Sequence, residues 1–249
     1  MSLSFLVPYA TPIIGEKCSV GLFEKLQFGN VDCIKLAISK ALGYGIVVFA
    51  AILKVPQIAK ILANKSAKGV SLMAYFVETL AFLVFIAYNH RALNPFSTWG
   101  EGLFIAVQNL IVIFLILALD RKFGVLLLTV SLLGGAAYSL ATPSIVSAPL
   151  LAKFQSSNLL LTILSKLPQI VAVYSSRSIG ALSGITVFLQ FAGTVARVFT
   201  TMQELKDDQV LIISSLVAAS LNAVLFLGVL LFSGGKEAQS PSKRRKKTN

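Results

Sequence analysis

The sequence has 249 residues, of which 56% are hydrophobic and only 13% are charged. Such a composition excludes an ordinary soluble domain, in which about a quarter of the residues carry charge, and favours a protein of the lipid bilayer. The formal net charge of +12 does not indicate a nucleic-acid partner, because five of the cations form one terminal run at residues 243–247 that suits a solvated cytosolic tail.

Seven stretches of the chain are apolar and long enough to cross about 30 Å of hydrocarbon as a helix. Their continuous apolar character favours helices, since the strands of a membrane barrel would alternate polar and apolar residues. The sequence therefore predicts an all-α membrane protein with spans at residues 34–62, 70–88, 99–119, 123–141, 157–174, 182–202 and 210–232.

The basic residues of the loops are concentrated on one side of the predicted membrane. The loops after the first, third and fifth spans and the C-terminal tail are basic, whereas the opposite side carries nearly balanced charge. Because lysine and arginine are enriched on the cytosolic side, we expect a cytosolic C-terminus and a lumenal N-terminal segment at residues 1–33. The glycosylation pattern "NKS" at Asn64 then lies in the cytosol and should carry no glycan.

Cys18 and Cys33 are the only cysteines of the chain. Both fall in the segment assigned to the lumen, where oxidising conditions permit a disulfide. A bridge that closes a loop of this length would contribute about 3 kcal/mol. We favour this bridge over the alternative of two unrelated thiols.

The end of the tail, "KKTN", places Lys246 and Lys247 as the fourth and third residues counted from the C-terminus. This spacing resembles the dilysine signal by which coat machinery returns membrane proteins to the endoplasmic reticulum. Such a signal is an address read by a receptor and adds no anchor. We therefore expect the basic tail, residues 233–249, to be cytosolic.

The chain contains an internal repeat. A shift of 112 residues, from 54 to 166, places "KVPQI" at Lys54 to Ile58 on "KLPQI" at Lys166 to Ile170. Each motif opens a unit of three spans, and the single span between them gives both units the same orientation about an axis along the membrane normal. The predicted architecture is three plus one plus three, with repeats at residues 34–119 and 146–232 and a linker helix at 120–145.

Each motif places a proline and a glutamine inside an apolar helix, Pro56 with Gln57 and Pro168 with Gln169. Proline removes its own N–H and displaces the carbonyl four residues earlier, so the helix bends and leaves a loose acceptor. In lipid that acceptor needs a partner, which the adjacent glutamine can supply. Matched bends in two repeats are typical of hinges beside a central transport site; a static kink is the alternative.

The duplicated motif and the layout of the spans resemble the PQ-loop family, which includes the SWEET sugar carriers and lysosomal amino-acid exporters. Further stretches, among them "ISKALGYGIVV" at 38–48 and "SGITVFLQFAGTVARVFTTMQE" at 183–204, resemble the branch of this family that serves dolichol-linked sugars. The resemblance implies an endoplasmic reticulum membrane protein required for using dolichol-phosphate-mannose and dolichol-phosphate-glucose. One departure is that the second motif lacks the proton-coupled aspartate of the lysosomal exporters.

Three functions fit this resemblance. The protein can flip the lipid-linked sugar, present it to lumenal glycosyltransferases without transport, or carry a small soluble sugar or amino acid. The sequence offers no metal-ligand cluster, cofactor loop or catalytic constellation, and its single histidine, His90, falls in a short polar loop. We therefore expect a transporter-like protein without a cofactor, and not an enzyme.

A flipped head group needs a polar cleft with at least one cation for its phosphate. Ionisable groups inside apolar spans are candidates, because they cost about 2.5–3.5 kcal/mol to insert at a helix centre and should face such a cleft. Structural pairing among them is the alternative, and Lys40, near a helix end, is expected to extend to the membrane surface. We assign Lys54, Lys166 and Arg197 to the phosphate, and Glu78, Gln190, Asn109 and Asn222 to the sugar.

Overall fold

The computed structural model describes residues 3–178 and 184–232, and every regular element in these residues is a helix. Seven helical segments of this part are long and apolar enough to cross a membrane, which confirms the predicted all-α fold. The basic tail at 233–249, with Lys246 and Lys247, lies outside the described residues. The spans are α3 (Val31–Ile52) continued by α4 (Val55–Asn64), α5 (Leu72–Arg91), α6 (Gly100–Leu119), α7 (Phe123–Ala141), α8 (Ala148–Ser176), α9 (Gly184–Glu204) and α10 (Gln209–Phe232).

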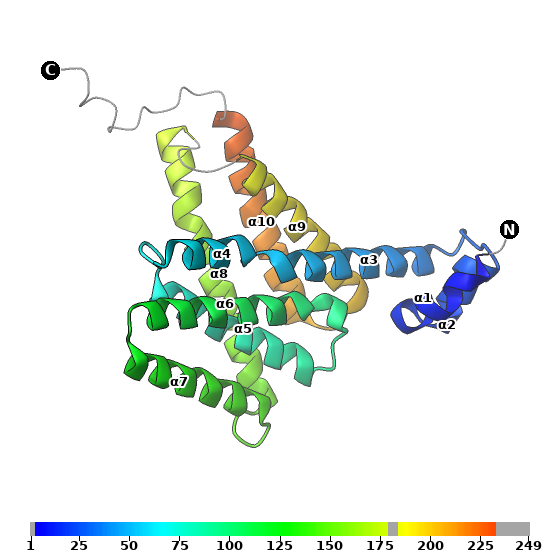
Figure 1. Ribbon diagram of the computed structural model, residues 1–249. Coiled ribbons are helices and arrows are strands. Elements are labelled where there is room, and N and C mark those ends of the chain that lie inside the picture. Colours follow the sequence, from blue (N-terminus) through cyan, green and yellow to red (C-terminus); the bar gives the residue numbers. More distant parts are fainter. Residues whose placement is uncertain (1–2, 179–183, 233–249) are drawn as a thin grey trace.

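Four short helical segments precede the first span and form a small N-terminal unit at the start of α3 (Figure 1). A disulfide joins Cys18 to Cys33, and the buried side chains of Ile14, Leu22 and Cys33 form the apolar centre of the unit. The bridge and these contacts hold the unit on the first turn of α3. The four segments are η1 (Ser4–Leu6), α1 (Val7–Ile14), α2 (Glu16–Ser19) and η2 (Val20–Glu24).

The fifth span is longer than the sequence predicted. We expected it at residues 157–174, but α8 begins at Ala148 and has 29 residues, or about 44 Å at 1.5 Å per residue. Pro149 lies in its first turn, where the missing N–H of proline would have no partner in any case. This proline therefore starts the helix and does not interrupt it.

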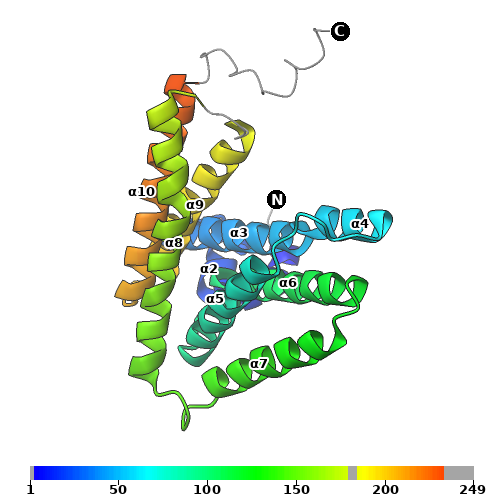
Figure 2. The ribbon, with the colours of Figure 1, turned by 90° about the vertical axis from the view of Figure 1, so that its left-hand side faces the viewer.

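The spans form two bundles of three, and α7 connects them (Figures 1 and 2). In the first bundle α6 contacts α3, α4 and α5, and in the second bundle α10 contacts both α8 and α9. The first helices of the two repeats, α3 and α8, cross at a steep angle in both views, and α3 starts beside the N-terminal unit whereas α8 starts next to the end of α7.

The two bundles meet in one region, which we call the shared end, and diverge away from it (Figures 1 and 2). There α3 contacts α9, and α5 contacts α8. We expected two units of the same orientation related by an axis along the membrane normal, and the two bundles are splayed. The contacts between them lie at the shared end, where Lys40 of α3 bonds to Glu204 at the end of α9 and Tyr88 of α5 bonds to Asp208 just before α10.

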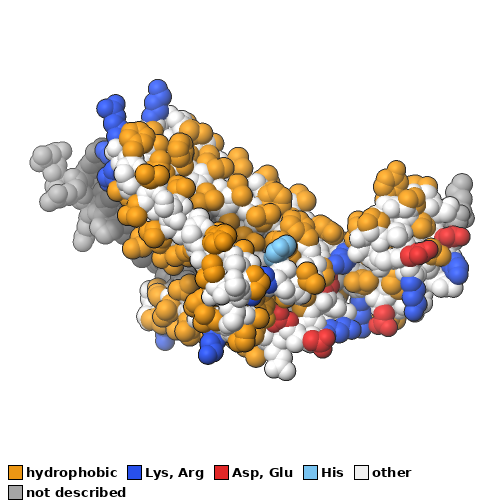
Figure 3. All heavy atoms as spheres, turned by 90° about the horizontal axis from the view of Figure 1, so that it is seen from below, with side chains coloured by type: hydrophobic (Ala, Val, Ile, Leu, Met, Phe, Trp, Pro, Cys, Tyr) orange, Lys and Arg blue, Asp and Glu red, His pale blue; other side chains and the backbone are white. Residues whose placement is uncertain are grey.

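The surface of the bundles is apolar. Hydrophobic side chains cover most of the face in Figure 3, whereas acidic and basic side chains gather on the N-terminal unit at its right. Val48, Leu127, Leu164 and Leu231, on four different spans, are each 66–70% exposed. Large exposed aliphatic side chains on every side suit contact with lipid, so the chain is a multi-pass membrane protein.

Candidate functional site

The first proline-glutamine motif breaks its span into two helices, because α3 ends at Ile52 and α4 begins at Val55. Gln108 of α6 bonds to the backbone on both sides of the break. Its Oε1 accepts from the Lys54 N–H at 2.8 Å, and its Nε2 donates to the Ala50 carbonyl at 2.8 Å. The side chain is buried, so these backbone groups are satisfied inside the membrane.

The second motif does not repeat this break. α8 runs without interruption from Ala148 to Ser176 with Pro168 inside it. The counterpart of Gln108, 112 residues later, is Ser220, whose short side chain donates to the Leu216 carbonyl of its own helix. The two motifs therefore differ: the first lies at a break bridged by an amide from another helix, whereas the second lies inside a continuous helix.

The glutamines of the two motifs do not supply the partners that we expected. Gln57 and Gln169 are both exposed, as are Pro56 and Pro168. The physical reason is geometric, since the Gln57 side chain is exposed while the Lys54 N–H and the Ala50 carbonyl at the break face α6. The residue that satisfies the first break lies on a different helix and has no neighbour relation to the motif in the sequence.

Replacing Gln108 by leucine should lower the free energy of unfolding by about 2 kcal/mol, because each buried backbone group left unpaired costs about 1–3 kcal/mol. Thermal unfolding of the purified protein in detergent measures the change. Ser220→Ala, at the repeat-related position, is the matched control and should change stability by less than about 0.5 kcal/mol. Equal effects at the two positions would contradict the role of Gln108 at the break.

The lysines of the two motifs hold partners at repeat-related positions. Lys54 Nζ lies 2.6 Å from Glu78 Oε2 and 4.6 Å from the centroid of the Tyr75 ring. Lys166 Nζ donates to Gln190 Oε1 at 2.7 Å. Positions 78 and 190 are also 112 residues apart. The same pair of positions thus holds an ion pair in the first bundle and a lysine–amide contact in the second.

Arg197 of α9 reaches across to the first bundle. Its guanidinium donates to the Thr98 carbonyl at 2.8 Å and forms an ion pair with Glu101 near the start of α6. The two charged side chains are only 19% and 14% exposed. Because hydrogen bonds between charged partners are stronger than neutral ones, this contact ties the two bundles together near the shared end.

A cleft of about 640 Å³ lies between α5 and α8, where the bundles begin to diverge. Half of its lining residues are polar, and the other half are alanine, valine, leucine and phenylalanine. Glu78 is accessible there, since 41% of its side chain is exposed. The polar lining residues are Glu78, Glu101, Gln155, Asn158, Thr162, Ser165 and Ser214.

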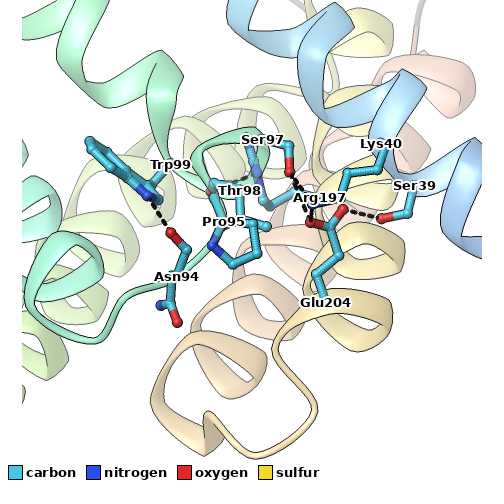
Figure 4. A network of polar contacts seen from close by, with 9 residues as sticks. All are labelled: Ser39, Lys40, Asn94, Pro95, Ser97, Thr98, Trp99, Arg197 and Glu204. Atoms are coloured by element: carbon cyan, nitrogen blue, oxygen red, sulfur yellow. Dashed lines mark hydrogen bonds and ion pairs between the residues drawn. The ribbon is translucent and has the colours of Figure 1, made fainter. Parts of the chain in front are cut away.

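The shared end is closed by a group of hydrogen bonds around Glu204, which we call the Glu204 cluster (Figure 4). Its Oε1 accepts from the Ser39 hydroxyl at 2.6 Å, and its Oε2 accepts from Lys40 Nζ at 2.6 Å and from the Ser97 hydroxyl at 2.8 Å. The Glu204 side chain is 2% exposed. Lys40 therefore does not extend to the membrane surface as expected, because a buried carboxylate of α9 binds it.

Comparison with known proteins supports the repeat. The model of the PQ loop repeat matches the chain twice, at residues 38–98 and 152–210. The chain belongs to the PQ-loop family. It is also similar to the human protein named solute carrier family 66 member 3, with 28% identity over 164 residues that cover 65% of this chain and 78% of the relative.

The PQ-loop repeats place the predicted site residues in three different settings. Glu78 lines the cleft and is paired with Lys54, whereas Arg197 is bound to Glu101. Lys166 and Gln190 contact each other and are not among the lining residues, although Ser165, next to Lys166 in the chain, is. Asn109 and Asn222 are buried and do not line it, and both Asn109 side-chain atoms and Asn222 Oδ1 are buried without a hydrogen-bond partner.

Sequence reasoning missed the polar face of α8. Gln155, Asn158, Thr162 and Ser165 follow each other at spacings of three, four and three, which places them on one side of a helix. All four line the cleft, and Asn158 also donates to the Ala81 carbonyl of α5 at 3.1 Å. The spacing was visible in the sequence, but the fifth span was expected to begin only at residue 157.

Proposed function

We propose that this PQ-loop protein binds a dolichol-phosphate-linked sugar in the cleft between its bundles and carries the head group across the membrane. The observation that supports this proposal most directly is the mixed lining of the cleft. Carboxylate, amide and hydroxyl groups suit the hydroxyls of a sugar, and the alanine, leucine and phenylalanine side chains suit the start of a polyprenyl chain. A soluble solute would use only the polar half.

The splayed bundles suit a ligand that cannot be enclosed. A polyprenyl chain is far longer than any cavity of this protein, so its binding site has to open sideways into lipid. The bundles are held at the shared end by Glu204 and Arg197 and diverge beyond it. A head group can then occupy the cleft while its chain remains in the bilayer, and the role proposed is binding and transport and not catalysis.

The ligand class and the cellular location that we propose rest on a sequence resemblance. Four stretches resemble the mannose-phosphate-dolichol utilization defect 1 proteins, at residues 16–18, 38–48, 96–104 and 183–204. We place the protein in the endoplasmic reticulum, with the shared end and the N-terminal unit in the lumen and the basic tail in the cytosol, where coat machinery would read it. Mannose and glucose donors are the proposed ligands. A glycan found on Asn64 would reverse this orientation and contradict the placement.

The experiment is reconstitution of the purified protein in liposomes with a short-chain mannosyl-phosphoryl lipid. We expect movement of the lipid between leaflets to be at least tenfold faster than in liposomes without protein. Thr162→Val removes a hydroxyl from the cleft and should slow this movement several-fold. The matched control is Thr194→Val on α9, because Thr194 bonds only to carbonyls of its own helix and does not line the cleft.

A second candidate function is presentation of the lipid-linked sugar to lumenal glycosyltransferases. It is favoured by the N-terminal unit, where the aromatic side chains of Phe5, Tyr9 and Phe28 are 66%, 75% and 63% exposed. The reconstitution separates the candidates. Uptake of a soluble sugar or amino acid without lipid movement would indicate a small-solute carrier, and movement of neither would favour presentation.

A further inference from the structure

The two repeats differ in charge at one pair of equivalent positions. In the first bundle Lys54 is neutralised by the carboxylate of Glu78 at 2.6 Å. In the second bundle Lys166 meets the uncharged amide of Gln190 at 2.7 Å. The contact geometry is therefore kept between the repeats while the negative charge is missing from the second.

Lys166 is for this reason the uncompensated cation among the three that we assigned to a phosphate. Glu78 binds Lys54, and Glu101 binds Arg197. Within residues 3–178 and 184–232, Lys166 forms no ion pair; this residue is partly buried, whereas Gln190 of α9, which it contacts, is exposed. A lone cation within an apolar span is costly unless an anion compensates it.

We propose that Lys166 and Gln190 form an anion subsite at the end of the cleft, and that Gln190 keeps the subsite open for a phosphate. This inference rests on the proposed function and names the part of the ligand that is bound there. The amide oxygen of Gln190 accepts a hydrogen bond from Lys166. The amide nitrogen of Gln190 can then donate to the phosphate that Lys166 binds. A glutamate would instead neutralise the lysine and offer no donor.

The subsite lies in line with the polar face of α8. Lys166 is one helical turn beyond Thr162 and next to Ser165, both of which line the cleft. At 1.5 Å per residue, Thr162 is about 6 Å and Asn158 about 12 Å along the axis from Lys166. That span is the size of a phosphate and one hexose, so a phosphate on Lys166 places the sugar against hydroxyl and amide groups.

The assignment revises the division of roles predicted from the sequence. Lys54 and Arg197 are already paired and would have to lose a carboxylate before they could bind a phosphate. Because breaking either ion pair would leave a charged group without its partner, the ligand is expected to use the lysine that has no carboxylate. The pair within the first bundle and the pair between the bundles then shape the cleft, and Lys166 of the second bundle selects the charge of the ligand.

The test is Gln190→Glu, which makes the second bundle chemically equal to the first at this pair. Binding of a short-chain mannosyl-phosphoryl lipid, and of inorganic phosphate, is measured on the full chain in vesicles. We expect at least a tenfold weaker affinity for the phosphorylated lipid, with little change for an uncharged mannosyl lipid. Lys166→Gln should act likewise, and Lys166→Arg should keep most of the affinity.

Gln209→Glu is the charge-matched control, because it adds one carboxylate at an exposed position at the start of α10 and should leave binding unchanged. If Gln190→Glu binds the phosphorylated lipid as well as the unmodified protein does, the subsite is overturned and the proposed function stands. The unmodified protein could instead bind inorganic phosphate but not the phosphorylated lipid, and lose phosphate binding in Gln190→Glu. That result would support the subsite and reject a lipid ligand. Binding of neither ligand would overturn both proposals.

Discussion

Replacing Gly43 by alanine is expected to lower the free energy of unfolding by about 3 kcal/mol. A Cβ atom added at this position of α3 would lie 2.5 Å from the carbonyl oxygen of Ser97. The obstacle is the backbone of η3 (Phe96–Thr98) and not the end of a flexible side chain, so the added methyl group forces the α5–α6 connection to move. Thermal unfolding in detergent should show a Tm about 6–12 °C lower.

Gly45 provides the control on the same helix. A Cβ atom there would meet no atom within 4 Å, and alanine is the better helix former by about 0.5–1 kcal/mol. Gly45→Ala should therefore leave the Tm unchanged or raise it slightly. A similar decrease in Tm for both variants would mean that α3 responds to the change of residue in general. The close approach of η3 to Gly43 would then not determine the stability.

Ser97 connects this close approach to the contact between the bundles. Its carbonyl faces Gly43, while its hydroxyl donates to Glu204 and accepts from Lys40 at 3.0 Å. A displacement of η3 would therefore also displace a hydrogen bond of the Glu204 cluster. The small residue on α3 is thus part of the reason that the shared end stays closed.

The fold could be predicted from the sequence because its signals are local and repeated. The length of each apolar stretch sets a span, and the second "PQI" fixes the repeat without knowledge of any contact. The splay of the bundles could not be predicted in the same way. It depends on Lys40 of α3 and Glu204 of α9, which are 164 residues apart and belong to different repeats.

The candidate site was only partly predictable for the same reason. Lys54, Glu78, Lys166 and Gln190 were found because charged and amide residues are rare in apolar spans, but their pairing emerged only when the helices were brought together. Gln108 is another amide in an apolar span, and it proves to be the partner of a broken backbone. A polar residue inside a span is thus visible in the sequence, whereas its partner is not.

Removal of either charge of the Glu204 cluster should be the most destabilising polar change in the described part of the chain. Lys40→Met leaves a carboxylate that is 2% exposed without its cation, and Glu204→Gln leaves Lys40 without its anion. Breaking a buried ion pair by removing one partner costs about 3–5 kcal/mol, and replacing both partners costs less than the sum. We therefore expect the loss of unfolding free energy in the double variant to be smaller than the sum of the two single-variant losses, by at least about 1 kcal/mol.

The exposed pair of Lys122 and Asp120 is the control for this double-mutant cycle. Its atoms lie 3.2 Å apart, but the side chains are 59% and 51% exposed, so its coupling should stay below about 1 kcal/mol. If the cycle at Lys40 and Glu204 gives an equally small coupling, the Glu204 cluster does not hold the bundles together. A large coupling would mean that opening the shared end requires the loss of these same contacts, because no other carboxylate in the cluster can take over Lys40.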